Sequence, residues 1–272
     1  MARSIGLEFI SGLGMAPADF VELAARLGCT AIGLAPQPIV GPLAGAAGWT
    51  LRDQPALCAE LGRALVQNGV SVALGEGFLI MPGRAIADAA GDVAMMADLG
   101  AARLNVVVIE ADRTRAIAEF RAFAALARAH RLPVTIEFMP GMPLASLGQT
   151  LAFLDEAGVD DAGVLVDAMH FFASGAQPAE LAAAPAHRIH YAQLCDARAA
   201  GLYEGYYEDA RCNRPVPGEG VLPLAGFVAA LPAACPIGLE LPLLARAEAG
   251  EALEPLLAAA LEKARALLAG RP

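Results

Sequence analysis

The chain has 272 residues, of which 57% are hydrophobic and 18% charged, so it is too apolar to be disordered and can fill a large core. Its formal net charge of -10 excludes the basic surface that nucleic-acid binding requires. No apolar stretch reaches the roughly 18 residues that span a bilayer, and no signal segment is evident. With five scattered cysteines, expected to be reduced thiols, these features predict a cytoplasmic protein without a membrane partner.

Short apolar runs alternate with longer segments rich in alanine and leucine along the whole chain. Several of the short runs are continuously apolar, which is typical of parallel strands that are covered on both faces. In chain order the predicted strands are Ile5–Ile10, Ala31–Ala35, Val70–Leu74, Leu104–Ile109, Pro133–Phe138, Gly163–Asp167, Arg188–Leu194 and Ile237–Leu241.

The longer segments between these runs have the composition of helices. Several are followed directly by glycine, as at Gly69 and Gly158, which suits the left-handed residue that ends many helices. The predicted helices are Pro17–Leu27, Gln54–Asn68, Arg84–Leu99, Arg113–His130, Leu144–Ala157, Pro178–Ala184, Leu222–Leu231 and Glu248–Leu268.

This order of elements predicts an α/β protein with repeated strand–helix units. Eight strands close a small barrel, and the chain length matches a (β/α)8 TIM barrel. Because no linker or shift in composition divides the chain, we expect residues 1–272 to form a single TIM-barrel domain. A doubly wound open sheet is the alternative, but the turn Ser11-Gly-Leu-Gly14 lacks the glycine spacing of a nucleotide-binding sheet.

Two long segments without predicted structure, Pro36–Thr50 and Asp196–Gly220, follow the second and seventh strands. Both therefore lie on the side of a barrel that carries substrate loops. The second segment is rich in tyrosine and charged residues. We interpret it as a loop that covers the substrate, with a merely solvated loop as the alternative.

Three predicted strands end at or close to a carboxylate, namely Glu137, Asp167 and Glu240. A buried carboxylate costs several kcal/mol unless it is paired or bound to a cation. Because barrel strands end at one rim, we expect these acids to share a site, where a divalent cation relieves their repulsion more directly than the few arginines can. His170 follows Asp167 by three residues and faces the same mouth. Glu76 follows the third predicted strand and is a candidate substrate contact.

The seventh predicted strand offers two possible ligands, His190 and Gln193. Because they are three residues apart, they face opposite sides of a regular strand, and only one can face the barrel interior. Gln193 lies nearer the end of the strand, whereas histidine is chemically the better ligand for many divalent metals. The sequence leaves this choice open.

The chain resembles the sugar phosphate isomerase/epimerase superfamily, the xylose isomerase-like TIM barrels. The resemblance rests on Ile136-Glu137, Asp167-Ala-Met-His170, Tyr191-Ala-Gln-Leu-Cys-Asp196, Pro217-Gly-Glu-Gly220 and Leu239-Glu240. It implies one divalent cation held by Glu137, Asp167, Gln193 and Glu240, with Gln193 in place of the usual histidine. An all-oxygen set favours Mn²⁺ or Mg²⁺, with Co²⁺ or Zn²⁺ as alternatives.

The resemblance also implies a function. It predicts a metal-dependent isomerase or epimerase that acts on a sugar or related polyhydroxy carbonyl compound through an enediolate. Glu137 and Glu240 would exchange the proton, His170 would orient the substrate, and Arg214 and Glu76 would contact it. A metal-dependent dehydratase of the inosose or 3-dehydroshikimate type and a non-catalytic binding barrel are the alternatives. We expect a small-molecule substrate and a homo-oligomer.

Overall fold

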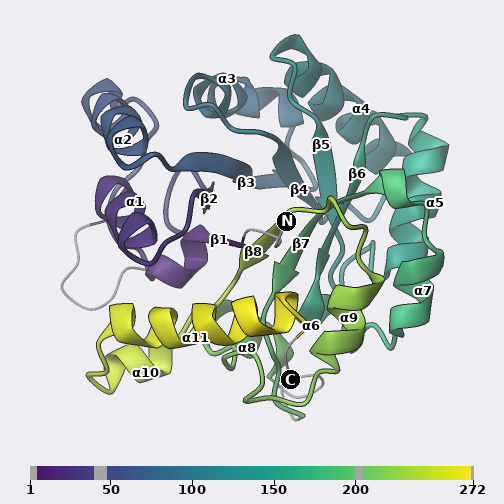
Figure 1. Cartoon of the computed structure of the whole chain (residues 1–272). Coiled ribbons are helices and arrows are strands. Elements are labelled where there is room, and N and C mark those ends of the chain that lie inside the picture. The colour runs from purple at the N-terminus through teal and green to yellow at the C-terminus, as the bar shows by residue number, and fades with distance from the viewer. Residues whose placement is uncertain (1–4, 40–47, 200–204, 271–272) are drawn as a thin grey trace.

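The structure is a computed structural model that describes residues 5–39, 48–199 and 205–270. In these ranges eight parallel strands pair in chain order and close into a barrel, which confirms the predicted TIM-barrel fold (Figure 1). The strands are β1 (Ile5–Leu7), β2 (Ala31–Leu34), β3 (Ser71–Ile80), β4 (Leu104–Val108), β5 (Val134–Glu137), β6 (Gly163–Asp167), β7 (Ile189–Leu194) and β8 (Ile237–Leu239).

Helices surround the strands and bury their apolar faces against the outside of the barrel (Figure 1). No helix in the described ranges is long and apolar enough to cross a membrane. The helices are α1 (Pro17–Arg26), α2 (Pro55–Asn68), α3 (Ala90–Asp98), α4 (Arg113–Ala129), α5 (Leu147–Ala157), α6 (Ala168–Ala173), α7 (Pro178–Ala183), α8 (Tyr206–Cys212), α9 (Leu224–Ala230), α10 (Leu244–Glu248) and α11 (Leu253–Leu268).

The third strand is longer than predicted and changes the position of Glu76. The prediction ended at Leu74 because the following Gly-Glu-Gly interrupts the apolar run. The chain instead continues as β3 to Ile80, with Gly77 at a φ of 86° and a shift of register against β4 between Gly75 and Phe78. Glu76 therefore lies within the strand and not at its end.

Other boundaries differ where short turns replace regular structure. β1 ends at Leu7, and the last two residues of the predicted strand, Phe9 and Ile10, belong to a 3₁₀ turn over Phe9–Gly12. The last predicted helix, Glu248–Leu268, begins later, as α11 at Leu253, and Glu248 instead ends the unpredicted helix α10. Of the two predicted irregular segments, residues 40–47 and 200–204 lie outside the described residues, and the second segment contains the unpredicted helix α8.

The interior of the barrel has an apolar floor with a polar layer above it. Leu74, Leu165 and Tyr191 form a buried cluster separate from the main core. Since side chains two residues apart on a strand share a face, Glu76, Asp167 and Gln193 follow these three residues into the interior, one layer closer to the C-terminal ends. The polar layer thus lies at the face where barrel enzymes carry their active sites.

Glu8, the residue directly after β1, also points into this interior and is fully buried. Its Oε1 accepts a hydrogen bond from the Tyr191 hydroxyl at 2.7 Å. A Cβ atom on Gly33 of β2 or Gly238 of β8 would overlap the Glu8 carboxyl group. The two glycines therefore provide the space that a carboxyl group needs inside the barrel.

We expect the substitution Gly238→Ala to lower the free energy of unfolding by about 1–3 kcal/mol, the usual cost of overpacking. The added Cβ would overlap Glu8 and come within 2.8 Å of the Tyr191 hydroxyl oxygen. Urea denaturation measures this change. In the control Gly62→Ala, nothing lies within 4 Å of the added atom, so stability should be unchanged or slightly higher. Equal stability of Gly238→Ala and the wild type would contradict the proposed packing around Glu8.

Candidate active site

Five of the buried carboxyl groups at the C-terminal ends of the strands lie close enough to form one interacting group: Glu8, Glu76, Glu137, Asp167 and Glu240. Their charges act on one another, and this repulsion raises the pKa of Glu76 and Glu240 further after burial has raised it. The strand-end acids expected from the sequence are therefore in one site, together with Glu8, which the sequence analysis did not single out.

Arg214 bridges two of these acids. Its Nη1 atom lies 2.6 Å from Asp167 Oδ2 and 2.6 Å from Glu240 Oε2, and only 3% of its side chain is exposed. Burial alone would raise the pKa of Asp167, but Arg214 and His170 outweigh burial and hold this pKa at about 2. The sequence analysis expected a cation to relieve this repulsion more directly than the few arginines can, yet one guanidinium already pairs with two of the acids.

The other three acids have no such partner. In the described part of the chain, no lysine or arginine forms an ion pair with Glu8, Glu76 or Glu137, although the imidazole of His170 lies 3.4 Å from Glu137. One guanidinium thus faces five carboxyl groups. Protons or a further cation must relieve the remaining repulsion.

Glu8 and Glu76 can relieve it in part by sharing a proton. Glu8 Oε2 and Glu76 Oε1 make no regular hydrogen bond, yet the Glu8 side chain is within hydrogen-bonding reach of both Glu76 and Gln193. One proton between the two glutamates would satisfy both oxygens. Burial is the main reason that the pKa of Glu8 rises to about 7 and that of Glu76 rises well above its usual value.

The Asp-x-x-His motif is a helix cap. Asp167 ends β6 and precedes α6, and its Oδ1 accepts a hydrogen bond from the backbone N–H of His170 at 2.9 Å. A carboxylate at this position suits the start of a helix. The spacing of three residues therefore holds His170 beside Asp167, with Nδ1 3.5 Å from Asp167 Oδ1.

Two further residues fix the orientation of this histidine and of Glu137. The Tyr206 hydroxyl, from α8, lies 2.5 Å from His170 Nδ1, and His170 Nε2 lies 3.4 Å from Glu137 Oε1. Asn105 of β4 donates a hydrogen bond to Glu137 Oε2 at 2.8 Å. Sequence reasoning missed the roles of Tyr206 and Asn105. The tyrosine-rich composition of the loop was the one signal that pointed toward Tyr206.

Gln193 and not His190 faces the interior. Gln193 is fully buried, and neither of its amide atoms makes a regular hydrogen bond, although the side chain lies within hydrogen-bonding reach of Glu8. His190 packs outside the barrel against Gly163 of β6, with Nε2 3.1 Å from the carbonyl oxygen of His187. A buried amide without a regular hydrogen bond is costly, so Gln193 Oε1 is available to a ligand.

The donor chemistry of the mouth fits a hard divalent cation. Glu137, Asp167, Gln193 and Glu240 come from four consecutive strands and offer only oxygen atoms, which Mg²⁺, Mn²⁺ and Ca²⁺ prefer. Two of the four are engaged by Arg214. As they stand, no three histidine, cysteine, aspartate or glutamate side chains of the described residues are spaced to hold a metal ion.

The fold and these motifs agree with a comparison to known families. Residues 21–261 match the family model described as the xylose isomerase-like TIM barrel. The chain belongs to this family. No curated protein sequence gave a significant match.

Solved structures with the same fold include three whose names state a bound metal or a reaction. The IolI protein with a bound zinc atom has 14% sequence identity and a TM-score of 0.80, covering 99% of each chain. The probable 3-DHS dehydratase AsbF of Bacillus anthracis has 16% identity and a TM-score of 0.75, covering 95% of this chain and 97% of that one. D-psicose 3-epimerase of Clostridium cellulolyticum H10, solved with D-tagatose, has 14% identity and a TM-score of 0.72, covering 98% and 99%. At these identities the likeness shows the fold alone.

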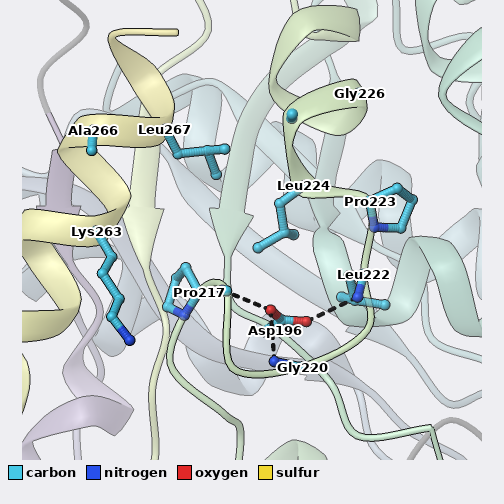
Figure 2. Close-up of a pocket in the computed structure, with 12 residues that line it drawn as sticks. Asp196, Pro217, Gly220, Leu222, Pro223, Leu224, Gly226, Lys263, Ala266 and Leu267 are labelled. Carbon is cyan, nitrogen blue, oxygen red and sulfur yellow. Dashed lines mark hydrogen bonds between the residues drawn. The ribbon is translucent and has the colours of Figure 1, made fainter. Parts of the chain in front are cut away.

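In this xylose isomerase-like barrel, Asp196 has a structural role. Its Oδ1 accepts the N–H groups of Ala197 and Leu222, and its Oδ2 accepts those of Gly218 and Gly220, at 2.8–3.0 Å. Figure 2 shows how the carboxylate gathers the loop around it, beside a hollow of about 490 Å³ that lies next to α9 and α11. Because both oxygens are satisfied, Asp196 organises the loop that follows Arg214 and offers no free ligand atom.

In the wild type, we expect Glu8 to make the free energy of unfolding fall as pH rises. The substitution Glu8→Gln should abolish this part of the pH dependence. The unfolded chain releases the Glu8 proton near its usual pKa of 4.5, whereas the folded chain keeps it to about 7. The contribution of Glu8 to the free energy of unfolding therefore falls as pH rises through this window, by roughly 3 kcal/mol in total. Urea denaturation of chelator-treated protein between pH 5 and pH 8 measures the change. Parallel pH profiles for Glu8→Gln, the wild type and the exposed control Glu60→Gln would contradict the assignment.

Proposed function

We propose that this protein is a divalent-metal-dependent isomerase or epimerase that acts on a sugar or related polyhydroxy carbonyl compound through an enediolate. The observation that best supports this proposal is the set of four oxygen donors on consecutive strands. Two glutamates, Glu137 and Glu240, flank Asp167 and Gln193, whose amide makes no regular hydrogen bond. In this proposal the two glutamates act as acid–base groups on either side of a cation held between these strands.

Glu137, Asp167, Gln193 Oε1 and Glu240 would hold the cation, with Mn²⁺ or Mg²⁺ favoured by the all-oxygen set. When bound, such a cation polarises a substrate carbonyl and lowers the pKa of the neighbouring C–H group. The zinc atom of the IolI structure and the family membership support the use of a divalent metal. They leave its identity to experiment.

The two glutamates are suited to move a proton. Asn105 holds the Glu137 carboxylate in position through a hydrogen bond to Oε2. Burial raises the pKa of Glu240 well above its usual value, although Arg214 opposes this rise, and a carboxylate with a raised pKa is better suited to accept a proton. In the proposed reaction one glutamate removes the proton next to the carbonyl and the other returns a proton. Return to the opposite face gives an epimer, and return to the neighbouring carbon gives an isomer.

The surrounding residues would hold the substrate and exclude water. Tyr206 and Asp167 orient the imidazole of His170, which is 1% exposed, toward Glu137. We propose that His170 holds a substrate oxygen next to the reacting carbon. Glu76, in the polar layer of β3, would contact a hydroxyl deeper in the barrel. A cytoplasmic location and a homo-oligomeric state stay predictions.

The substrate class rests on the chemistry that the related barrels share. One similar structure is named as D-psicose 3-epimerase, and another is named as a probable 3-DHS dehydratase. In both reaction classes the first step removes a proton next to a carbonyl. Dehydration differs because a β-hydroxyl group leaves and the proton is not returned, so the products distinguish the two reactions.

We expect Mn²⁺-loaded protein in D₂O to introduce deuterium next to the carbonyl of a ketose, an inosose or a dehydroshikimate-like acid. Proton NMR follows the exchange, and ultraviolet absorbance reports a conjugated dehydration product. Glu137→Gln and Glu240→Gln should each lower the rate at least about 100-fold, because each removes an acid–base group.

The control for these variants is Glu219→Gln, which replaces a half-exposed glutamate that pairs with Lys263. It should keep the wild-type rate, and circular dichroism should show that all three variants are folded. If protein shown to bind Mn²⁺ gives neither exchange nor dehydration with any of the three substrate classes, the enzyme proposal is wrong. The non-catalytic binding barrel is then the better interpretation.

A further inference from the structure

One nitrogen atom stands where a cation bound by Asp167 and Glu240 would stand. Arg214 Nη1 lies 2.6 Å from a carboxylate oxygen of each residue. Divalent cations of the proposed kind lie about 2.0–2.6 Å from carboxylate oxygens. The guanidinium nitrogen and the ion would therefore occupy nearly the same position. Both are positively charged, so they cannot be there at the same time. They cannot share these two oxygens.

Several contacts besides the two acids hold the buried side chain of Arg214 in this position. Its Nε donates a hydrogen bond to the carbonyl oxygen of Ala210 at 2.7 Å, and its Nη1 lies 3.3 Å from the sulfur of Cys195. The helix that carries Ala210, α8, is itself attached to the barrel mouth. Tyr206 contacts His170 as described, and the Tyr207 hydroxyl donates a hydrogen bond to the carbonyl oxygen of Pro140.

The structure explains why a chain would keep an arginine inside a cation site. Asp167 and Glu240 are both buried, and a buried acid that loses its only positive partner strongly destabilises a fold. Without a divalent ion, Arg214 supplies this charge. The neighbouring donors Gln193 Oε1 and Glu137 Oε1 accept no hydrogen bond from Arg214, so they remain for an incoming ion.

We propose that Arg214 and the divalent cation are alternative counter-ions of the Asp167–Glu240 pair, so that the ion binds only as the guanidinium leaves. This inference rests on the proposed function, because it assumes that the site takes a divalent cation. It makes Arg214 the residue that sets the cation affinity. It also means that loading the site releases a guanidinium beside the substrate position, where it can reach a substrate oxygen.

The test compares Mn²⁺ binding by isothermal titration calorimetry in chelator-treated wild type and two variants. Arg214→Met removes the charge but keeps an unbranched side chain, and it should bind Mn²⁺ at least tenfold more tightly than the wild type. Arg214→Lys keeps a charge on a shorter side chain that cannot bridge both acids as well, and its affinity should lie between the two. The matched control is Arg198→Met, which removes the partner of Asp209 on α8 without touching the site, and its affinity should equal that of the wild type.

Thermal unfolding supplies a second measurement that does not depend on activity. Without metal, Arg214→Met should unfold at a lower temperature than the wild type, because two buried carboxylates then face each other. Saturating Mn²⁺ should raise its unfolding temperature by more than it raises that of the wild type, since tighter binding gives a larger stabilisation. If Arg214→Met folds only with Mn²⁺, the same conclusion follows from a comparison of its folded fraction with and without the ion.

The outcomes separate this inference from the proposed function. If the wild type and Arg214→Met bind Mn²⁺ with equal affinity, the counter-ion exchange is wrong while the metal site stands. Weaker binding by Arg214→Met overturns the inference in the same way and makes Arg214 a residue that supports the bound ion. If neither protein binds Mn²⁺, both the metal-dependent function and the exchange are wrong.

Discussion

The site is governed by one constraint, the compensation of buried negative charge. Five carboxyl groups lie inside the mouth of the barrel, and a single guanidinium contacts two of them. Other features of the site reduce the remaining negative charge. A proton shared by Glu8 and Glu76 would remove one charge, and the amide of Asn105 donates a hydrogen bond to Glu137. A divalent cation would complete the compensation.

The acids come together because side chains alternate between the inside and the outside of the barrel along each strand. Leu74, Leu165 and Tyr191 fill the interior, and the residues two positions further along their strands place polar groups directly above them. Gly33 and Gly238 leave the room that the Glu8 carboxyl group requires. A closed apolar floor below and strand ends above confine the acids to one small volume. Their charges therefore cannot be relieved by solvent alone.

The sequence predicted the parts of the site that depend on local pattern. Glu137 and Asp167 lie at or near the ends of continuous apolar strands, the three-residue spacing put His170 at the same mouth as Asp167, and strand alternation allowed only one of His190 and Gln193 to face inward. These features follow from two-residue and three-residue periodicity, which a single sequence displays. The barrel followed from eight such strands in alternation with helices.

The remaining features depend on contacts between distant segments and could not be read from local pattern. Arg214 reaches Asp167 and Glu240 from a loop, and Tyr206 belongs to a short helix within a segment that had no helical pattern. Glu8 was hidden inside the first predicted strand, which ended three residues earlier than expected. Glu76 was assigned to a strand end because glycines interrupt β3, although the strand continues past them.

The measurement that tests the central claim most directly is the number of divalent ions bound per chain. Wild-type protein would be equilibrated by dialysis against Mn²⁺ and analysed for metal content beside the variant Asp167→Asn. Our account predicts one Mn²⁺ per chain in the wild type and none in the variant. No bound metal in folded wild-type protein would contradict it and would mean that protons and Arg214 alone compensate the five acids.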